Sequence, residues 1–492
     1  MFYKLKADII FRDYDGFGYI TDNRNFGYKP ANDSGNDIGD KIISSSGTVF
    51  LTVLGRKPKE LECLAQELCL RFTDVDYETI RGDAEEFYKQ LEEDGFLVSG
   101  KTADECERKD SISLCAEPKK RDSKANPLQV VPTPQEYLDQ YFGGVPQLTH
   151  LHMEITGKCN ERCIHCYIPH ESKICHMPPN LFYDILEQCR KMNVLHLTIS
   201  GGEPMLHPDF AGFLQRCNEL NFSVNILSNL TLLDENILTV MRQNHLLCVQ
   251  TSLYAMDAAI HDSITNVNGS FEKTMRGILT LLDHNVPLQI SCPIMKQNVS
   301  CYHDVVKWGK AHNVNVNGDY VIIGQYDHSP HNLASRLDID EIEHLIRLTA
   351  AQDTHYWERT ASEADKTRDM TPDDYICSVC QASICVSETG MAYPCAGWQG
   401  YILGDLKTTS LREIWDCSPA VQYLRGLRRR DFPQCIDCKD KEFCTMCMVR
   451  NANEDPAGDL HAVNPFFCRI AALNRELFFE HVQSNDSSAL AN

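Results

Sequence analysis

From residue 148 to residue 323 the sequence alternates between short apolar runs, which predict strands, and amphipathic stretches, which predict helices. The predicted strands are Leu148–Ile155, Val194–Ser200, Ser223–Leu227, Leu247–Leu253, Leu288–Ile294 and Gly318–Ile323. The predicted helices between them include Asn180–Met192, Pro208–Leu220, Glu235–Arg242, Ser270–Asp283 and Tyr302–Ala311. Consecutive βα units imply a parallel sheet. We therefore predict an α/β fold built on a partial, TIM-like (β/α)6 barrel, with its functional site at the carboxyl ends of the strands.

Three cysteines follow the first predicted strand in one short loop. Cys159, Cys163 and Cys166 are separated by three residues and then by two. A four-iron cluster normally takes four thiolates, so a loop that offers three leaves one iron open to another ligand. Structural zinc sites instead use paired Cys or Cys/His sets, which this loop does not provide. The loop therefore predicts a [4Fe-4S] cluster with one open iron.

Polar and glycine-rich segments follow the next three predicted strands. Gly201, Gly202 and Glu203 follow the second strand, Asn229 follows the third, and Ser252 ends the fourth. The carboxyl ends of parallel strands meet at one rim of a barrel. These segments are therefore expected to surround the cysteine loop.

The cysteine loop and the Gly-Gly-Glu segment resemble those of radical S-adenosylmethionine (radical SAM) enzymes. The resemblance implies that the open iron chelates the amino and carboxylate groups of SAM, which one electron cleaves to a 5′-deoxyadenosyl radical. Carried over residue by residue, Gly201, Gly202 and Glu203 would hold the SAM amino group, and Asn229 and Ser252 would contact its ribose and carboxylate. His165 and Tyr167 would lie near the adenine. As alternatives, the glycines could form only a tight turn, and Asn229 and Ser252 could be ordinary strand-end residues.

A second group of cysteines begins at Cys377. Its members with ligand-like spacing are Cys377, Cys380, Cys395, Cys435, Cys438, Cys444, Cys447 and Cys468. The pattern resembles the SPASM extension, which implies two auxiliary [4Fe-4S] clusters. One would be held by Cys380, Cys395 and Cys447, with Cys377 as the fourth ligand or Cys385 as its rival. The other would be held by Cys435, Cys438, Cys444 and Cys468; paired zinc sites are the alternative.

The pattern of residues 1–100 predicts a separate small module. We predict a strand at Val49–Leu54, helices at Pro58–Phe72 and Asp83–Asp94, and a closing apolar β-turn at Gly95–Val98. This winged-helix-like plan resembles the PqqD-like peptide-recognition domain. The resemblance implies that the module binds the leader of a precursor peptide as an added strand. A capping domain without a ligand is the alternative.

Composition and length limit the remaining possibilities. The chain has 492 residues and a net charge of −22, which argues against a nucleic-acid partner. There is no run of 18 apolar residues, and the N-terminus lacks the apolar region of a signal peptide. We therefore expect a cytoplasmic protein with reduced cysteines and no membrane partner. The expected domains are residues 1–100, a polar linker at 101–145, the barrel at 146–345, a connector at 346–371 and the SPASM domain at 372–492.

The combined resemblances imply a radical SAM oxidoreductase that matures a ribosomally synthesised peptide. The leading product is a thioether crosslink, with carbon–carbon or carbon–oxygen crosslinks next. The expected cofactors are the SAM-binding cluster, two auxiliary clusters and SAM, and the expected electron donor is of the flavodoxin or ferredoxin type. A sulfatase-maturase-like activity is disfavoured because Ala396, rather than an acidic residue, follows Cys395. Haem-precursor chemistry and a non-enzymatic electron carrier are further alternatives.

Overall fold

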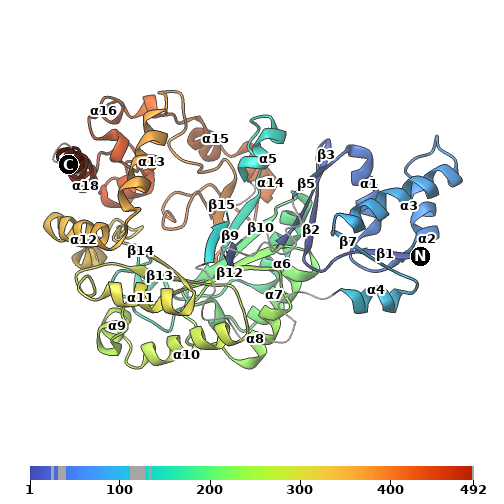
Figure 1. Cartoon of the computed structure of the whole chain (residues 1–492), viewed down its shortest axis with the longest axis horizontal. Coiled ribbons are helices and arrows are strands. Elements are labelled where there is room, and N and C mark those ends of the chain that lie inside the picture. Colours follow the sequence, from blue (N-terminus) through green and yellow to red (C-terminus); the bar gives the residue numbers. More distant parts are fainter. Residues whose placement is uncertain (24–26, 31–39, 111–127, 132–134, 490–492) are drawn as a thin grey trace.

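The computed structural model describes residues 1–23, 27–30, 40–110, 128–131 and 135–489. A central α/β barrel carries the N-terminal module on one side and the C-terminal domain on the other (Figure 1). None of the described helices is both long enough and apolar enough to cross a membrane.

The barrel sheet contains six parallel strands in the order β14-β13-β12-β11-β10-β9. Their bounds are β9 (His150–Thr156), β10 (His196–Gly201), β11 (Ser223–Leu227), β12 (Leu246–Ser252), β13 (Leu288–Pro293) and β14 (Asn315–Asp319). The helices between them are α6 (Pro179–Lys191), α7 (Phe210–Glu219), α8 (Glu235–Arg242), α9 (Ala258–Thr265), α10 (Ser270–Asp283) and α11 (Tyr302–His312). The predicted α/β fold with a partial barrel is confirmed. Helix α9 was not predicted, and the last strand begins three residues earlier than expected.

The two faces of the barrel sheet differ in character. Leu151, Leu197 and Val249 lie on the outer face, where they belong to one apolar core with the surrounding helices. On the inner face, His150 bonds to Thr198 at 2.8 Å, from one strand to the next. The alternation along each strand thus buries an apolar layer under the helices and leaves a polar interior.

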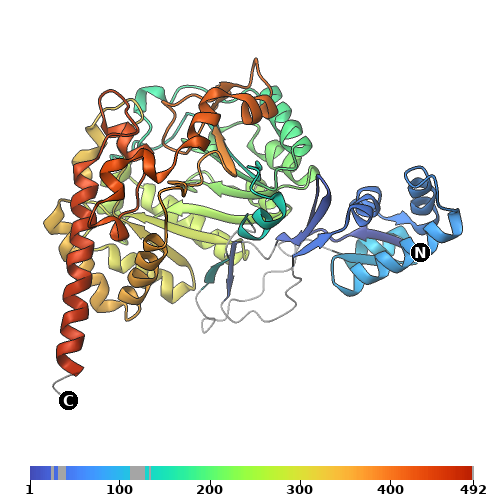
Figure 2. The same ribbon diagram turned by 90° about the horizontal axis from the view of Figure 1, so that it is seen from above.

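The C-terminal domain extends the barrel sheet rather than forming a separate one. Strand β15 (Ser383–Val386) pairs in parallel with β9, and β16 (Met391–Tyr393) and β17 (Gly404–Asp405) follow as antiparallel neighbours. The remaining C-terminal elements are short apart from the last helix. They are α14 (Leu411–Cys417), α15 (Pro419–Gly426), α16 (Pro433–Ile436), α17 (Met448–Glu454) and α18 (Pro465–Ala489). Figure 2 shows α18 running along one side of the molecule and past its edge.

Two helices connect the barrel to the C-terminal domain. Helix α12 (Ile339–Gln352) begins with a capping box, in which the Asp338 side chain accepts from Glu341 N and the Glu341 side chain accepts from Asp338 N. Helix α13 (Tyr356–Arg368) lies within the expected connector. Its residue Trp357 stacks on His481 of α18, with ring centroids 5.2 Å apart.

The N-terminal module contains two small antiparallel sheets and a helical layer. The sheets have the orders β6-β1-β7 and β2-β3-β5. The strands are β1 (Phe2–Leu5), β2 (Ile9–Tyr14), β3 (Phe17–Asp22), β5 (Lys41–Ile43), β6 (Lys59–Glu60) and β7 (Leu97–Gly100). The helices are α1 (Ser45–Leu54), α2 (Leu61–Cys69) and α3 (Tyr77–Glu93). The strand predicted at Val49–Leu54 is therefore wrong, because this segment lies inside α1.

The predicted linker is more structured than its composition suggests. It contains α4 (Ala103–Lys109), β8 (Leu128–Val131), which pairs with β4 (Gly27–Pro30), and α5 (Gln135–Phe142). Linker residues 111–127 and 132–134 lie outside the described part of the chain.

The sheet that holds β2 sits against the amino-terminal ends of the barrel strands. Arg12 of β2 is fully buried and donates to the carbonyls of Val194 (2.8 Å) and Asn221 (2.6 Å), which precede β10 and β11. Tyr19 packs in the same apolar cluster as Leu195. The N-terminal module is thus fixed to the floor of the barrel, opposite the rim where the cysteine loop emerges.

Candidate active site at the barrel rim

The cysteine loop leaves β9 and is held in place by helix α9. Arg162 N donates to Thr265 O at 2.9 Å, and Ile164 N donates to Ile264 O at 3.0 Å. The side chain of Ile164 packs against an apolar cluster that includes Ile264. The helix that sequence analysis missed therefore fixes the backbone between the first and last loop cysteines.

The structure brings the three loop thiols together. Burial raises the pKa of Cys163 well above its usual range, and the neighbouring Glu161, Cys166 and Cys159 raise it further. The pKa of Cys159 is raised to about 11, mainly by burial. All three cysteines are half-buried. Three thiols at one half-open position fit a cluster that keeps one iron accessible.

The two glycines lie against the start of the cysteine loop. Gly201 has a φ of +142°, and a Cβ atom there would lie 2.1 Å from Thr156 O. A Cβ at Gly202 would lie 2.4 Å from Lys158 O. Gly202 N also donates to Thr156 O at 2.8 Å. Glycine is thus required where the second strand end meets the loop backbone, and the predicted contact with the SAM amino group stays a prediction.

Glu203 ties two strand ends together from a fully buried position. Its Oε1 accepts hydrogen bonds from Met205 N (3.0 Å) and Ser228 Oγ (2.8 Å), and its Oε2 accepts from Asn229 N (2.8 Å). Burial raises the pKa of Glu203 to about 7, although these hydrogen bonds oppose the rise. This carboxyl therefore positions Asn229, and its predicted contact with the SAM amino group stays a prediction.

The remaining predicted SAM-pocket residues approach the loop from the next two strands. Asn229 Nδ2 donates to Asn160 Oδ1 at 2.9 Å. Ser252 is a hydrogen-bond partner of the Tyr254 hydroxyl, which donates to Cys163 Sγ at 3.8 Å. The rings of Tyr254 and His165 make an edge contact at 5.2 Å. Sequence analysis did not single out Tyr254, because nothing local to the sequence assigns its hydroxyl to a cysteine.

Tyr167 differs from the other predicted pocket residues in facing the C-terminal domain. Burial raises its pKa, and the groups that raise it further include Glu154, Cys166 and Cys395. Tyr167 therefore lies between the barrel loop and the C-terminal cysteines. A place beside adenine, which the resemblance implied, stays a prediction.

Glu154 occupies the centre of this interface, and sequence analysis did not single it out. It lies near the end of β9 and is 2% exposed, and Gln399 of the C-terminal domain donates a hydrogen bond to it. Burial raises the pKa of Glu154 to about 8, and the nearby Glu388 adds to the rise. The hydroxyls of Tyr393 and Tyr167 and the Gln399 amide oppose it. The carboxyl is therefore mostly protonated at pH 7.

We expect the Glu154→Gln variant to change how stability depends on pH. The folded protein keeps a proton on Glu154 between the ordinary pKa of 4.5 and about 8, whereas the unfolded chain has released it. The stability of the native chain should therefore fall as pH rises through this window, by at most about 1.4 kcal/mol per pH unit. The variant should lack this fall. The test is to measure the denaturation midpoint of each protein from pH 5 to pH 9, with Glu86→Gln on the exposed surface of α3 as the control. If the midpoints of the native chain and of the Glu154→Gln variant change with pH in the same way, the prediction is wrong.

Four C-terminal cysteines gather beside the barrel. The pKa of Cys395 is raised to about 12, first by burial and then by the nearby thiols of Cys447 and Cys377. The pKa of Cys380 is also raised to about 12, first by burial and then by the nearby thiols of Cys377 and Cys395. Cys385, the rival ligand, also lies near Cys380 and Cys395. The structure therefore brings together the predicted first ligand set and its rival, and the choice of the fourth ligand stays a proposal.

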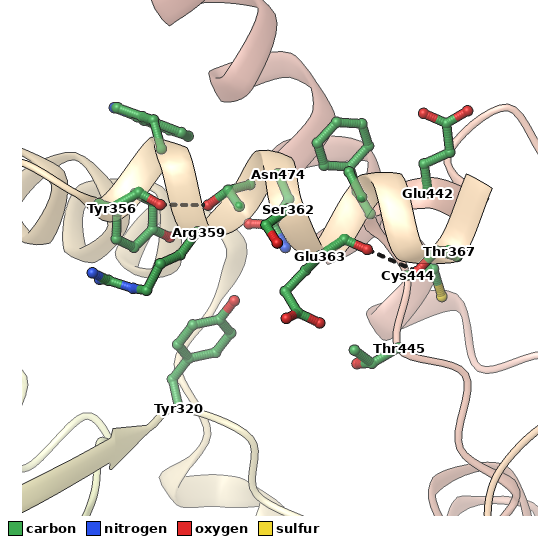
Figure 3. Close-up of a pocket in the computed structure, with 14 residues that line it drawn as sticks. Tyr320, Tyr356, Arg359, Ser362, Glu363, Thr367, Glu442, Cys444, Thr445 and Asn474 are labelled. Atoms are coloured by element: carbon green, nitrogen blue, oxygen red, sulfur yellow. Dashed lines mark hydrogen bonds between the residues drawn. The ribbon is translucent and has the colours of Figure 1, made fainter. Parts of the chain in front are cut away.

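The other four cysteines form a second group. The pKa of Cys444 is raised to about 11, mainly by burial and then by Cys468, Cys435 and Cys438. Cys444 also lines a pocket of about 480 Å³ between α13 and α18 (Figure 3). These four thiols make up the predicted second ligand set. Two separate sets of four fit two four-iron clusters, and their ligation is likewise a proposal.

Comparisons with known proteins agree with this geometry. Residues 153–309 match the radical SAM superfamily, and residues 377–439 match SPASM, an iron–sulfur cluster-binding domain. The AdoMet-dependent heme synthase of Methanosarcina barkeri is 24% identical over 318 residues, which cover 60% of this chain and 90% of that protein. The subtilosin biosynthesis protein AlbA of Bacillus subtilis is 25% identical over 335 residues, which cover 63% of this chain and 69% of AlbA.

Among solved structures, Streptococcus suis SuiB bound to its precursor peptide SuiA is similar over nearly the whole fold. The match has a TM-score of 0.57 at 14% identity and covers 93% of this chain and 98% of SuiB. The matched family domains place a SAM-binding [4Fe-4S] cluster in the barrel and iron–sulfur chemistry in the C-terminal domain. The chain is therefore a radical SAM enzyme with a C-terminal SPASM domain.

Proposed function

We propose that this enzyme oxidatively modifies a ribosomally synthesised peptide and closes a thioether crosslink. The observation that carries the proposal is the likeness in fold to SuiB, a protein solved with a precursor peptide, because it extends over 93% of this chain. The sequence similarity to a bacteriocin biosynthesis protein supports the same substrate class.

The proposed reaction removes two hydrogens from the peptide. Bound SAM supplies a radical that takes one hydrogen atom from a peptide carbon. Closing the S–C bond then requires the loss of the thiol proton and one electron. Within the chain, Tyr167, Glu154 and Tyr393 fill the space between the cysteine loop and Cys395. We propose that they keep water out of the region through which that electron leaves the peptide.

The N-terminal module is the proposed site for the peptide leader. In the β2-β3-β5 sheet, β2 faces the barrel, where Tyr14 Oη donates to Asn193 O at 3.2 Å. Strand β5 forms the other edge of the described sheet and is the edge that we propose for strand addition. Its short length suggests that side-chain contacts contribute as well.

Haem-precursor chemistry is the second candidate. The similarity to the heme synthase of M. barkeri favours it. It would, however, leave the N-terminal module without a role.

We expect the reconstituted enzyme to lower the mass of a cysteine-bearing substrate peptide by about 2 Da per crosslink, because one thiol hydrogen and one carbon-bound hydrogen are lost. The candidates are short reading frames beside the gene, tested with and without their leaders. Mass spectrometry should also show one fewer alkylatable thiol for each crosslink, and the leaderless peptide should react more slowly.

The same assay separates the alternatives. A loss of about 2 Da with every thiol still alkylatable would indicate a carbon–carbon or carbon–oxygen crosslink. A new aldehyde would indicate formylglycine formation. Modification of a haem precursor, with every peptide left intact, would overturn the peptide proposal.

A further inference from the structure

One tyrosine hydroxyl faces the sulfur of a loop cysteine. Tyr254 lies just after β12 and is 3% exposed, and its hydroxyl donates a hydrogen bond to Cys163 Sγ at 3.8 Å. Within the described residues, no other side chain donates to a sulfur of the cysteine loop. Cys159 Sγ accepts only from the backbone, from Glu161 N at 3.4 Å. Of the three loop thiols, Cys163 is therefore the one with a side-chain donor.

A second side chain bonds to the same sulfur in the opposite direction. Cys163 Sγ donates to Glu161 Oε2 at 3.5 Å. Iron binding takes the proton from a cysteine thiol, so this bond depends on a proton that the ligated sulfur no longer carries. The Tyr254 hydroxyl supplies its own proton, and its bond to the sulfur can persist. Tyr254 is thus the side chain that still donates when Cys163 is a ligand.

Ser252 supports the Tyr254 hydroxyl from the end of β12. Its side chain is a second hydrogen-bond partner of that hydroxyl. A phenol has a single proton, and Tyr254 gives it to Cys163, so Ser252 is the donor in this second bond. The hydrogen bonds therefore run from Ser252 to Tyr254 and from Tyr254 to Cys163. We call Ser252 and Tyr254 the donor pair.

The backbone and the ring of Tyr254 are held in place as well. Asn298 is fully buried, and its Nδ2 donates to Tyr254 O at 2.8 Å. Tyr254 N donates to His261 Nδ1 at 3.3 Å, and the rings of the two residues lie 5.2 Å apart. The ring of His165 makes an edge contact with the same tyrosine. A hydroxyl fixed in such a buried site makes a stronger hydrogen bond than an exposed one.

We propose that the donor pair raises the reduction potential of the barrel cluster by hydrogen-bonding to one of its sulfur ligands. Reduction moves one electron from an external reductant, which is oxidised, to the cluster, and no bond forms or breaks. The cluster thereby gains one negative charge. A donor aimed at a ligand sulfur stabilises this more negative state and makes the potential less negative. The proposal rests on the proposed ligation by Cys163, but on no particular peptide.

The test is a redox titration of the reconstituted full-length enzyme with dithionite, followed by electron paramagnetic resonance. The signal of the barrel cluster is the one that changes in a parallel sample with SAM, because that cluster has the open iron. We expect Tyr254→Phe to make its reduction about tenfold less favourable, which is a midpoint about 59 mV more negative. Ser252→Ala should shift the midpoint in the same direction by less, because Tyr254 keeps its own proton.

Tyr88→Phe is the matched control. Tyr88 is also fully buried, and its hydroxyl donates to Phe50 O at 2.9 Å, within the N-terminal module. Its loss should leave the midpoint unchanged. Iron content is measured in every variant. A purely structural role for Tyr254 would lower the iron content or the stability of the Tyr254→Phe variant without moving the midpoint.

An unchanged midpoint in Tyr254→Phe would overturn the proposal. If that variant loses iron, Ser252→Ala decides, and the proposal fails unless its midpoint is more negative than that of the native enzyme. If no signal of the native enzyme responds to SAM, the ligation proposed for Cys163 is wrong, and the inference is wrong with it. None of these measurements uses a peptide, so a failure of the proposed peptide modification is seen separately.

Discussion

Replacing Cys159, Cys163 and Cys166 together by alanine is expected to abolish the formation of 5′-deoxyadenosine. These are the three thiols that the barrel loop brings together, and Tyr254 and Glu161 contact Cys163 directly. Without them the open-iron cluster has no protein ligands left in the loop. The two C-terminal cysteine sets should keep their iron, because the substitutions do not touch them.

The measurement pairs product analysis with iron determination after anaerobic reconstitution. The native chain should hold about twelve irons and the triple variant about four fewer. Cys189→Ala is the matched control, since Cys189 is a buried thiol in the apolar core of the barrel; it should cleave SAM normally. Continued SAM cleavage in the triple variant, or a native chain with about four irons and the rest zinc, would contradict the assignment of the clusters.

The barrel could be predicted well because its signals are local. Each strand is a short apolar run, and the motif residues come where a run ends, so a parallel arrangement alone places Glu203 and Asn229 at one rim. The structure adds the side-chain hydrogen-bond partners, which the spacing of motifs along the sequence cannot predict. The hydrogen bonds from Ser228 and Asn229 to Glu203 join residues that are 25 and 26 positions apart. The partners of such side chains become known only when the strands are in register.

The wrong strand in the N-terminal module shows where local patterns are ambiguous. The segment around Phe50 and Leu51 is buried on most sides, so its apolar residues show no clear helical period. Both helix boundaries were nevertheless present in the sequence. Ser44 caps the amino end by accepting from Gly47 N, and Gly55, with a φ of +69°, ends the helix. The capping serine and the terminal glycine together indicate a helix more strongly than the β-branched and aromatic residues between them indicate a strand.

The attachment of the N-terminal module could not be predicted, because it depends on contacts between distant residues. Arg12 bonds to carbonyls 182 and 209 residues away. Its guanidinium also lies 5.3 Å from the ring centroid of Phe222. The sequence predicted a separate module joined by a linker, whereas in the structure the N-terminal module packs against the floor of the barrel. A truncation that starts near Gln129 would expose that floor, so substitutions at the contact are the better test of the module.

We expect Arg12→Ala to destabilise the fold by about 3–5 kcal/mol, because it removes a buried charged side chain whose three nitrogens each donate a hydrogen bond. The carbonyls of Val194 and Asn221 would lose their donors, and a cavity would open beside Phe222. Arg12→Lys should cost less, since it keeps the charge and one of the donors. The test is denaturant unfolding followed separately by proteolysis of the N-terminal module and by tryptophan fluorescence, because all four tryptophans lie outside that module. The N-terminal module should become susceptible first. Arg81→Ala, on the solvent side of α3, should cost under about 1 kcal/mol. If Arg12→Ala were as mild as Arg81→Ala, the module would not depend on this contact, and the rigid attachment inferred here would be wrong.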